Sequence, residues 1–263
     1  MSDMPEGTEP LRLLDAAFQG DLDSVREIVD SGVDVNTVDE EGNNALMFAS
    51  YSDREEIIEY LISKGIDLNI ANKEGHTPLM QAAENGRQQI VKILVEHGAK
   101  VNAKEANGYS AMKMACERSH FLIVKYLFEH GADINSSDNN GNTIFMYASS
   151  GSDLDIVRYI AARCHDINDK NNFGNNALMS ASEGGNLRIV RYLVEEKGFG
   201  PNTHNDFGKT PLMVAAEKGK TDMFIYLFEH GADSKQKDKK GMDALAYARK
   251  GKHKAIMDFI AAH

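Results

Sequence analysis

The chain has 263 residues, of which 42% are hydrophobic, and its formal net charge is −11. This size accommodates one or two ordinary domains or one elongated array, and the negative charge argues against a general nucleic-acid binder. The two cysteines, Cys116 and Cys164, exclude a disulfide framework and suit a reducing compartment, so we expect a cytoplasmic protein. No run approaches the roughly 18 apolar residues of a membrane helix, and we therefore expect no membrane insertion.

The beginning of the chain, MSDMPEGTEP, predicts an acidic tail over residues 1–9. It has no apolar core, so we expect no secretory signal there. Charge is uneven along the chain: residues 1–74 carry 18 acidic and 5 basic residues, a net charge of −13, whereas residues 234–263 carry 8 basic and 3 acidic residues, a net charge of +5. Opposite charges at the two ends predict weak end-to-end self-association of an otherwise monomeric chain.

A short line of sequence that begins with glycine recurs along the chain. It starts at Gly42 (GNNALMFAS), Gly75 (GHTPLMQAA), Gly108 (GYSAMKMAC), Gly141 (GNTIFMYAS), Gly174 (GNNALMSAS), Gly208 (GKTPLMVAA) and Gly241 (GMDALAYAR). The spacing is 33 residues throughout, except for 34 between Gly174 and Gly208. A sustained period of this size indicates a solenoid built from one repeated supersecondary unit.

Each line predicts a short helix, a turn and a second helix. A preferred helix N-cap stands two residues after each glycine: Asn44, Thr77, Ser110, Thr143, Asn176, Thr210 and Asp243. The second helix has an apolar face, as in Ile90, Val91, Ile93 and Leu94. Glycines that suit a left-handed residue after this helix follow at Gly32, Gly65, Gly98, Gly131 and Gly231, and turn-forming asparagines come next at Asn36, Asn69, Asn102, Asn135, Asn168 and Asn202.

The stretch GHTPLMQAAENGRQQIVKILVEHGAKVN resembles an ankyrin repeat, as does GKTPLMVAAEKG with FEHGAD behind it. The resemblance covers about residues 10–263 and implies an all-α fold, an ankyrin-repeat solenoid of antiparallel helix pairs with projecting β-hairpin-like loops and a concave face. We expect one ankyrin-repeat domain over residues 10–263. It would consist of an N-terminal cap (10–38), six internal units (39–237) and a C-terminal cap (238–263).

The chain departs from the family pattern in three places. Methionine replaces the family's histidine at Met47, Met80, Met146, Met179 and Met213, while Lys113 and Ala246 stand at the same place in two further lines. We expect this methionine row to pack in the core, the alternative being a ligand surface lined by methionine. Cys164 stands where a helix-ending glycine is expected, and the unit ending VEEKGFGPN carries the extra residue. Both irregular units are candidates for a bend, a local weak point or a functional insertion.

The sequence predicts no catalytic, metal or cofactor site. His97, His130 and His230 occur once per unit at a helix end, which favours a role at the helix C-terminus over a zinc site. Cys164 and His165 are adjacent, but adjacency does not supply the geometry that catalysis needs. Five tyrosines share one place in the second helix (Tyr60, Tyr126, Tyr159, Tyr192 and Tyr226), and we expect a packing row with hydroxyls in solvent rather than a stacking platform.

Function is then expected at positions that vary between units. The resemblance implies that loop tips and the ends of the first helices line a partner-binding concave face. The residues selected there are Tyr51, Glu84, Tyr109, Glu117, Arg118, Phe173 and Phe207. We expect a non-enzymatic protein–protein interaction scaffold whose acidic surface binds a basic partner, with association that weakens as salt rises. The alternatives are that Phe173 and Phe207 merely pack on each other, and that an enzyme or small-molecule receptor site lies between Cys164 and Phe207.

Overall fold

The structure is a computed structural model that describes residues 9–263. The expected acidic tail, residues 1–9, therefore lies outside the described residues except for Glu9, where the first helix begins. Every regular element in residues 9–263 is helical, and two isolated bridges, Val38 with Asn44 and Ser137 with Thr143, are the β-structure of this range. The predicted all-α class is confirmed.

The described residues form two compact units, of which unit 1 ends at Asp133 and unit 2 spans Ile134–His263. Unit 1 contains the helix pairs α1 (Glu9–Gln19) with α2 (Leu22–Asp30), α3 (Ala45–Ser52) with α4 (Glu55–Ser63), α5 (Pro78–Glu84) with α6 (Gln88–Glu96), and α7 (Ala111–Glu117) with α8 (Phe121–Glu129). Unit 2 contains α9 (Ile144–Ser150) with α10 (Leu154–Ala161), α11 (Ala177–Gly184) with α12 (Leu187–Arg191) and its continuation η1 (Tyr192–Glu196), α13 (Pro211–Lys218) with α14 (Thr221–Glu229), and α15 (Ala244–Lys250) with α16 (Lys254–Ala262).

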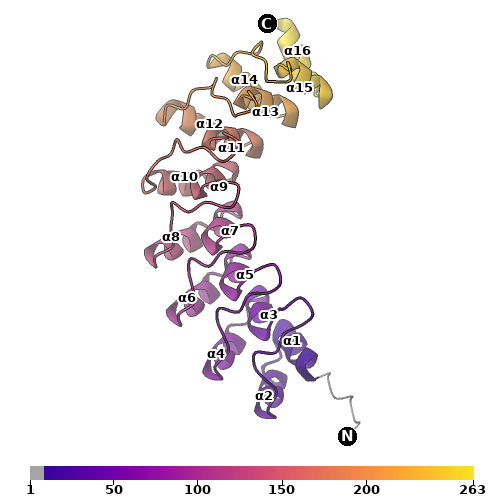
Figure 1. Cartoon of the computed structure of the whole chain (residues 1–263), viewed down its shortest axis with the longest axis vertical. Helices are drawn as coiled ribbons and strands as arrows, with labels where there is room; N and C mark the ends of the chain where they lie inside the picture. The colour runs from indigo at the N-terminus through magenta and orange to yellow at the C-terminus, as the bar shows by residue number, and fades with distance from the viewer. Residues whose placement is uncertain (1–8) are drawn as a thin grey trace. The chain divides into compact units, whose positions relative to one another are not determined.

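Each unit has two helical layers (Figure 1). The first helix of each pair contacts the first helix of the next pair, so that α1, α3, α5 and α7 form the first-helix layer of unit 1 and α9, α11, α13 and α15 that of unit 2. The even-numbered helices form the second-helix layer of each unit in the same way. The apolar stripe of each helix is thereby buried against its own partner and against the neighbouring pair.

Helix starts follow the predicted capping chemistry. All seven predicted N-caps accept a hydrogen bond from the backbone amide three residues later, as Thr77 Oγ1 does from Met80 N at 3.3 Å. Pro78 and Pro211 occupy the first turn of their helices, where the missing N–H leaves no bond unmade. The methionine row is buried at all five positions, so the prediction that it packs in the core is confirmed.

The extra residue of unit 2 is accommodated inside a second helix. α12 continues as the π-helix η1, and Phe199 N donates to Leu193 O, six residues back, at 3.0 Å. In a regular repeat the corresponding bond spans five residues, from Ala99 N to Leu94 O. The wider π-turn absorbs one residue without moving the buried Leu193 out of register.

The helix-end histidines and the tyrosine row take structural roles. The Nδ1 atoms of His97, His130 and His230 lie 2.7–2.8 Å from the carbonyl oxygen four residues earlier. Each ring thus pairs with a carbonyl of the last helical turn, in agreement with the predicted role at the helix C-terminus. The prediction of tyrosine hydroxyls in solvent is wrong for Tyr60, Tyr126 and Tyr226. Their hydroxyls donate to carboxylates of the preceding repeat: Asp30 (3.1 Å), Glu96 (3.5 Å) and Glu195 (2.9 Å). Burial, together with Glu195, raises the pKa of Tyr226 to about 12.

Candidate interaction surface

The loops before the first helices share one internal anchor. The residue three places before each loop glycine accepts two backbone hydrogen bonds on one side-chain oxygen, from the amides two and four residues later. Asn72 Oδ1, for example, accepts from Glu74 N at 3.0 Å and His76 N at 2.9 Å. The anchors are Asp39, Asn72, Glu105, Asp138, Asn171, Asn205 and Asp238. These anchors hold each loop tip in one conformation, which fixes the surface that the tips present.

Successive loops are also bonded to one another. In unit 1, Lys73 N donates to Glu41 O at 2.9 Å and Ala106 N donates to Glu74 O at 3.1 Å. Glu40, Glu41 and Glu74 are exposed at these tips and form no ion pair with another described residue. We use the name loop face of unit 1 for these tips together with the exposed ends of α3, α5 and α7.

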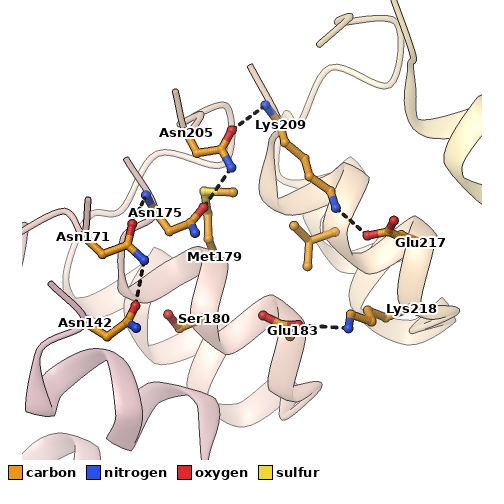
Figure 2. A pocket seen from close by; sticks show the side chains of 11 residues that line it. Asn142, Asn171, Asn175, Met179, Ser180, Glu183, Asn205, Lys209, Glu217 and Lys218 are labelled. Carbon is orange, nitrogen blue, oxygen red and sulfur yellow. Dashed lines mark hydrogen bonds and ion pairs between the residues drawn. The ribbon is translucent and has the colours of Figure 1, made fainter. Parts of the chain in front are cut away.

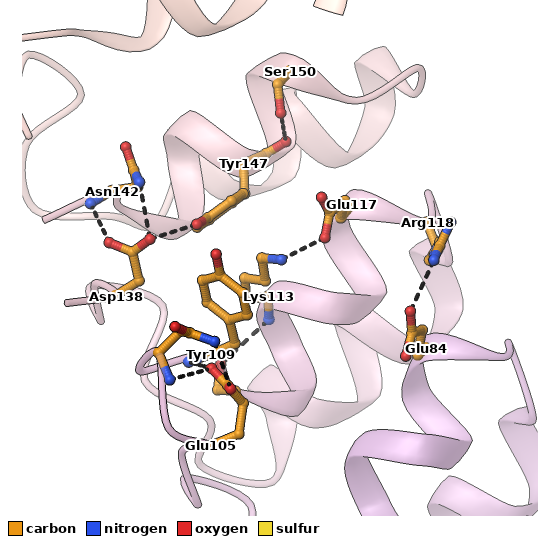
Figure 3. Close-up of polar contacts among 12 residues, drawn as sticks. Glu84, Glu105, Tyr109, Lys113, Glu117, Arg118, Asp138, Asn142, Tyr147 and Ser150 are labelled. Carbon is orange, nitrogen blue, oxygen red and sulfur yellow. Dashed lines mark hydrogen bonds and ion pairs between the residues drawn. The ribbon is translucent and has the colours of Figure 1, made fainter. Parts of the chain in front are cut away.

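Four of the residues selected from the sequence lie together on this loop face (Figure 3). Arg118 Nη2 donates to Glu84 Oε1 at 2.8 Å, and this bond raises the pKa of Arg118 above its ordinary value. Tyr109 and Glu117 come together through Lys113, whose Nζ lies 3.7 Å from the Tyr109 ring centroid and 2.5 Å from Glu117 Oε2. Glu84 and Glu117 are therefore each neutralised by a neighbouring cation, which the sequence did not indicate.

Lys113 occupies the place of the buried methionine in its repeat, and its side chain is only 8% exposed. The aliphatic stem packs where methionine would, while the amine reaches the carboxylate and the aromatic ring at the surface. The break in the methionine row was visible in the sequence. It was the signal that could have placed Lys113 in the surface cluster.

Tyr51 belongs to an aromatic pocket formed with Phe18 and Phe48. The ring centroids of Phe18 and Tyr51 are 6.1 Å apart with nearly parallel planes, and those of Phe18 and Phe48 are 6.2 Å apart with perpendicular planes. The pocket has a volume of about 320 Å³, and Asn43 and Met47 also line it. Tyr51 is 45% exposed. An open aromatic pocket of this size is large enough to receive one apolar side chain.

The two phenylalanines selected in unit 2 lie at successive loop tips. Their backbone amides donate to the anchors Asn171 and Asn205, each at 3.0 Å. Phe173 is 43% exposed and Phe207 is 56% exposed, so a large part of each residue remains open to contact. Asp206 N donates to Phe173 O at 3.0 Å, which links the two loops through the backbone.

An enzyme or receptor site between Cys164 and Phe207 would need an open pocket, and the groove in Figure 2 lies in this region. Its volume is about 210 Å³, and neither Cys164 nor His165 lines it. Its polar groups pair with one another: Asn171 with Asn142 at 2.7 Å, Asn205 with Asn175 at 2.9 Å, Lys218 with Glu183 at 2.9 Å, and Lys209 with Glu217. Groups that are already paired leave little to hold a substrate or ligand.

Cys164 shows no sign of activation as a nucleophile. Its side chain is half-buried, and burial raises the pKa of the thiol, which favours the unreactive protonated form. The backbone amide of His165 donates to Asn135 Oδ1 of the preceding repeat at 2.8 Å. The same bond recurs elsewhere, for example from Asp233 N to Asn202 Oδ1 at 2.8 Å, so it is part of the repeat and not of a catalytic site. Among residues 9–263, no cluster of three or more His, Cys, Asp or Glu side chains is arranged to hold a metal ion. No helix in this range has the length and apolar character needed to span a membrane.

Comparison with protein families gives a match to a family model described as ankyrin repeats (3 copies). The model matches residues 13–105, 100–171, 151–238 and 178–263, so that the matches together span residues 13–263. A search among curated proteins found no match.

Proposed function

The chain belongs to the ankyrin-repeat family, and we propose that it is a non-enzymatic scaffold that binds a basic segment of a partner protein through the loop face of unit 1. Ankyrin repeats are in general protein–protein interaction modules. The residues proposed to contact the partner there are Tyr51, Glu84, Tyr109, Glu117 and Arg118. Phe173, on unit 2, is proposed as a further apolar contact.

The observation that carries the proposal is an open aromatic pocket beside unpaired carboxylates. Asn43 lines the pocket and belongs to the same loop as Glu40 and Glu41. A segment that carries lysine or arginine next to an apolar side chain would satisfy both features at once. Tyr and Arg are the residue types that most often dominate binding energy, which supports roles for Tyr109 and Arg118.

Salt should weaken this interaction, because the carboxylates are exposed. Exposed charges act over about 8 Å at physiological ionic strength and are screened as salt rises. Steering by the loop-tip carboxylates should therefore raise the association rate more than it slows dissociation.

The loop-tip carboxylates supply the test. The double variant Glu41→Gln with Glu74→Gln removes two charges and changes almost no volume. We expect it to weaken the affinity for the partner about tenfold. Each exposed charge contributes roughly 0.7 kcal/mol, and two such losses add up to the 1.4 kcal/mol that a tenfold change in affinity requires. Capture from the source cell lysate on the immobilised chain, at low and at high salt, identifies the partner. Titration of that purified partner then measures the loss.

The matched control is Glu27→Gln with Glu59→Gln, which removes two exposed carboxylates from α2 and α4 in the second-helix layer. The control should leave affinity within about twofold. Equal losses in the two double variants would assign the effect to net charge alone and reject the loop face. Tyr51→Ala should weaken binding while lowering the free energy of unfolding by no more than about 1 kcal/mol, the loss of its stacking on Phe18. Unchanged affinity in that variant would remove the aromatic pocket from the site.

A further inference from the structure

We propose that unit 2 carries a second docking site, of opposite charge, that binds an acidic peptide segment of a partner protein with one apolar side chain inserted beside Phe207. We call it the lysine pocket and define it by Phe207, Lys209, Lys239, Lys240, Met242 and Lys250. It stands apart from the function proposed above, since that function places a basic partner on unit 1.

The lysine pocket lies between two loops and the last helix of the first-helix layer of unit 2. Its volume is about 330 Å³. Lys239 N donates to Phe207 O at 2.9 Å, which joins the two loops. The open ring of Phe207 forms an apolar wall, half-buried Met242 extends this wall, and the buried ring of Tyr247 lies beneath.

Asp238 holds the lysine-bearing loop in place. Its Oδ1 accepts from Lys240 N at 2.9 Å and from Met242 N at 2.8 Å, and its Oδ2 accepts from the Tyr247 hydroxyl at 2.7 Å. Although burial opposes the shift, these hydrogen bonds hold the pKa of Asp238 below its ordinary value. The carboxylate therefore fixes the backbone of the loop that carries Lys239 and Lys240. The positive charge of Lys240 contributes to the lowered pKa of Asp238, although the two side chains form no ion pair.

Three of the four pocket lysines have no ionic partner. Lys209 pairs with Glu217, and its amine lies 4.8 Å from the Tyr247 ring centroid. Lys239, Lys240 and Lys250 are exposed, and none of them forms an ion pair with another described residue. The lining carries four lysines and two carboxylates, Glu217 and Asp238, so its net charge is 4 − 2 = +2. A positive lining around an open apolar wall forms the complement of an acidic segment with an apolar anchor.

The chemistry of the lining favours carboxylates over a nucleic acid. All the cations are lysines, which act as point charges on flexible stems, and no arginine fork is present to grip phosphate with two parallel bonds. The net charge of −11 opposes a long polyanion further, whereas a short acidic segment meets mainly the local lysines.

The test uses the full chain and a fluorescent peptide of alternating Glu and Asp residues with a central Leu-Phe pair. Fluorescence anisotropy measures its affinity. Lys239→Glu with Lys240→Glu should weaken binding at least about tenfold, since two attractive charges become repulsive. The matched control, Lys235→Glu with Lys237→Glu, changes two exposed lysines of the same chain segment that do not line the pocket, and it should weaken binding less than about threefold. Equal losses in the two double variants overturn the proposal.

A second arm tests the apolar anchor. Phe207→Ala should weaken binding of the Leu-Phe peptide severalfold and should not affect a peptide in which Gly-Gly replaces Leu-Phe. Equal affinity of the two peptides for the unaltered chain would overturn the anchor. Tighter binding of oligothymidylate than of the Leu-Phe peptide would overturn the choice of ligand. Self-association that is abolished by Lys239→Glu with Lys240→Glu, in light scattering without peptide, would replace the proposed partner by a second copy of this chain.

Discussion

Replacing Met80 with Asp is expected to lower the free energy of unfolding by about 3–5 kcal/mol, the cost of an uncompensated buried charge. Met80 is 1% exposed and lies in α5, which contacts α3 and α7. A carboxylate at this depth loses its hydration, and the short aspartate side chain cannot carry the charge out to solvent. Urea unfolding followed by circular dichroism at neutral pH measures the loss.

Two comparisons sharpen this prediction. Met80→Leu conserves volume and apolar character and should cost less than about 1.5 kcal/mol. Burial also raises the pKa of a new carboxyl, so the penalty of Met80→Asp should be largest at neutral pH and should shrink as the pH falls and the group becomes protonated. A Met80→Asp variant as stable as Met80→Leu would contradict the placement of the methionine row in the core.

The natural exception at Lys113 shows why charge alone does not decide the outcome. Lysine at the same repeat position is accommodated because its long stem carries the amine out to Glu117 and to the Tyr109 ring. Aspartate lacks that reach. The same position in the repeat therefore accepts a long cation in α7 and should reject a short anion in α5.

In unit 2, Phe224→Ala is expected to lower the free energy of unfolding by about 3–5 kcal/mol. Phe224 is fully buried in α14, and its ring packs edge-on against Phe259 of α16, with centroids 6.1 Å apart. Truncation removes that contact and leaves a cavity between the last two helix pairs, which can collapse only partly. The measurement is urea-induced unfolding of the full chain.

Phe207→Ala is the matched control, since it makes the same chemical change at a loop tip where the ring is 56% exposed. Its effect on stability should stay within about 0.5 kcal/mol, even though the same substitution is expected to weaken binding of the acidic peptide. Similar stability losses in Phe224→Ala and Phe207→Ala would contradict the burial assigned to these rings.

The helices and their buried faces could be predicted from the sequence because both depend on local patterns. An N-cap such as Thr210 acts on amides within its own first turn, and the methionine row repeats with the period of the fold. The loop anchors were equally accessible, since Asp, Asn or Glu stands three places before every loop glycine. Their residue type alone, however, did not reveal this role, which depends on a loop conformation that brings the amides two and four residues later onto one side-chain oxygen.

The interaction surface was less predictable, because it depends on contacts between repeats. Phe18 lies in the first helix pair, which has no loop glycine to set its register, so its position beside Tyr51 could not be derived from the repeat. The pairing of Arg118 with Glu84 joins residues 34 positions apart. The π-turn at η1 could not be predicted either. The period shows that one residue has been inserted, but it does not show at which position the insertion disturbs the packing of the helices least.

Carboxyl labelling gives the most direct test of whether the loop face of unit 1 holds the partner. The full chain is treated with a carbodiimide and an amine, with and without the captured partner, and each carboxylate is quantified by mass spectrometry. Binding at the loop face should protect Glu40, Glu41 and Glu74 and should leave Glu27 and Glu59 on the second helices unchanged. Protection of Glu27 and Glu59 with the loop tips still fully labelled would contradict the account.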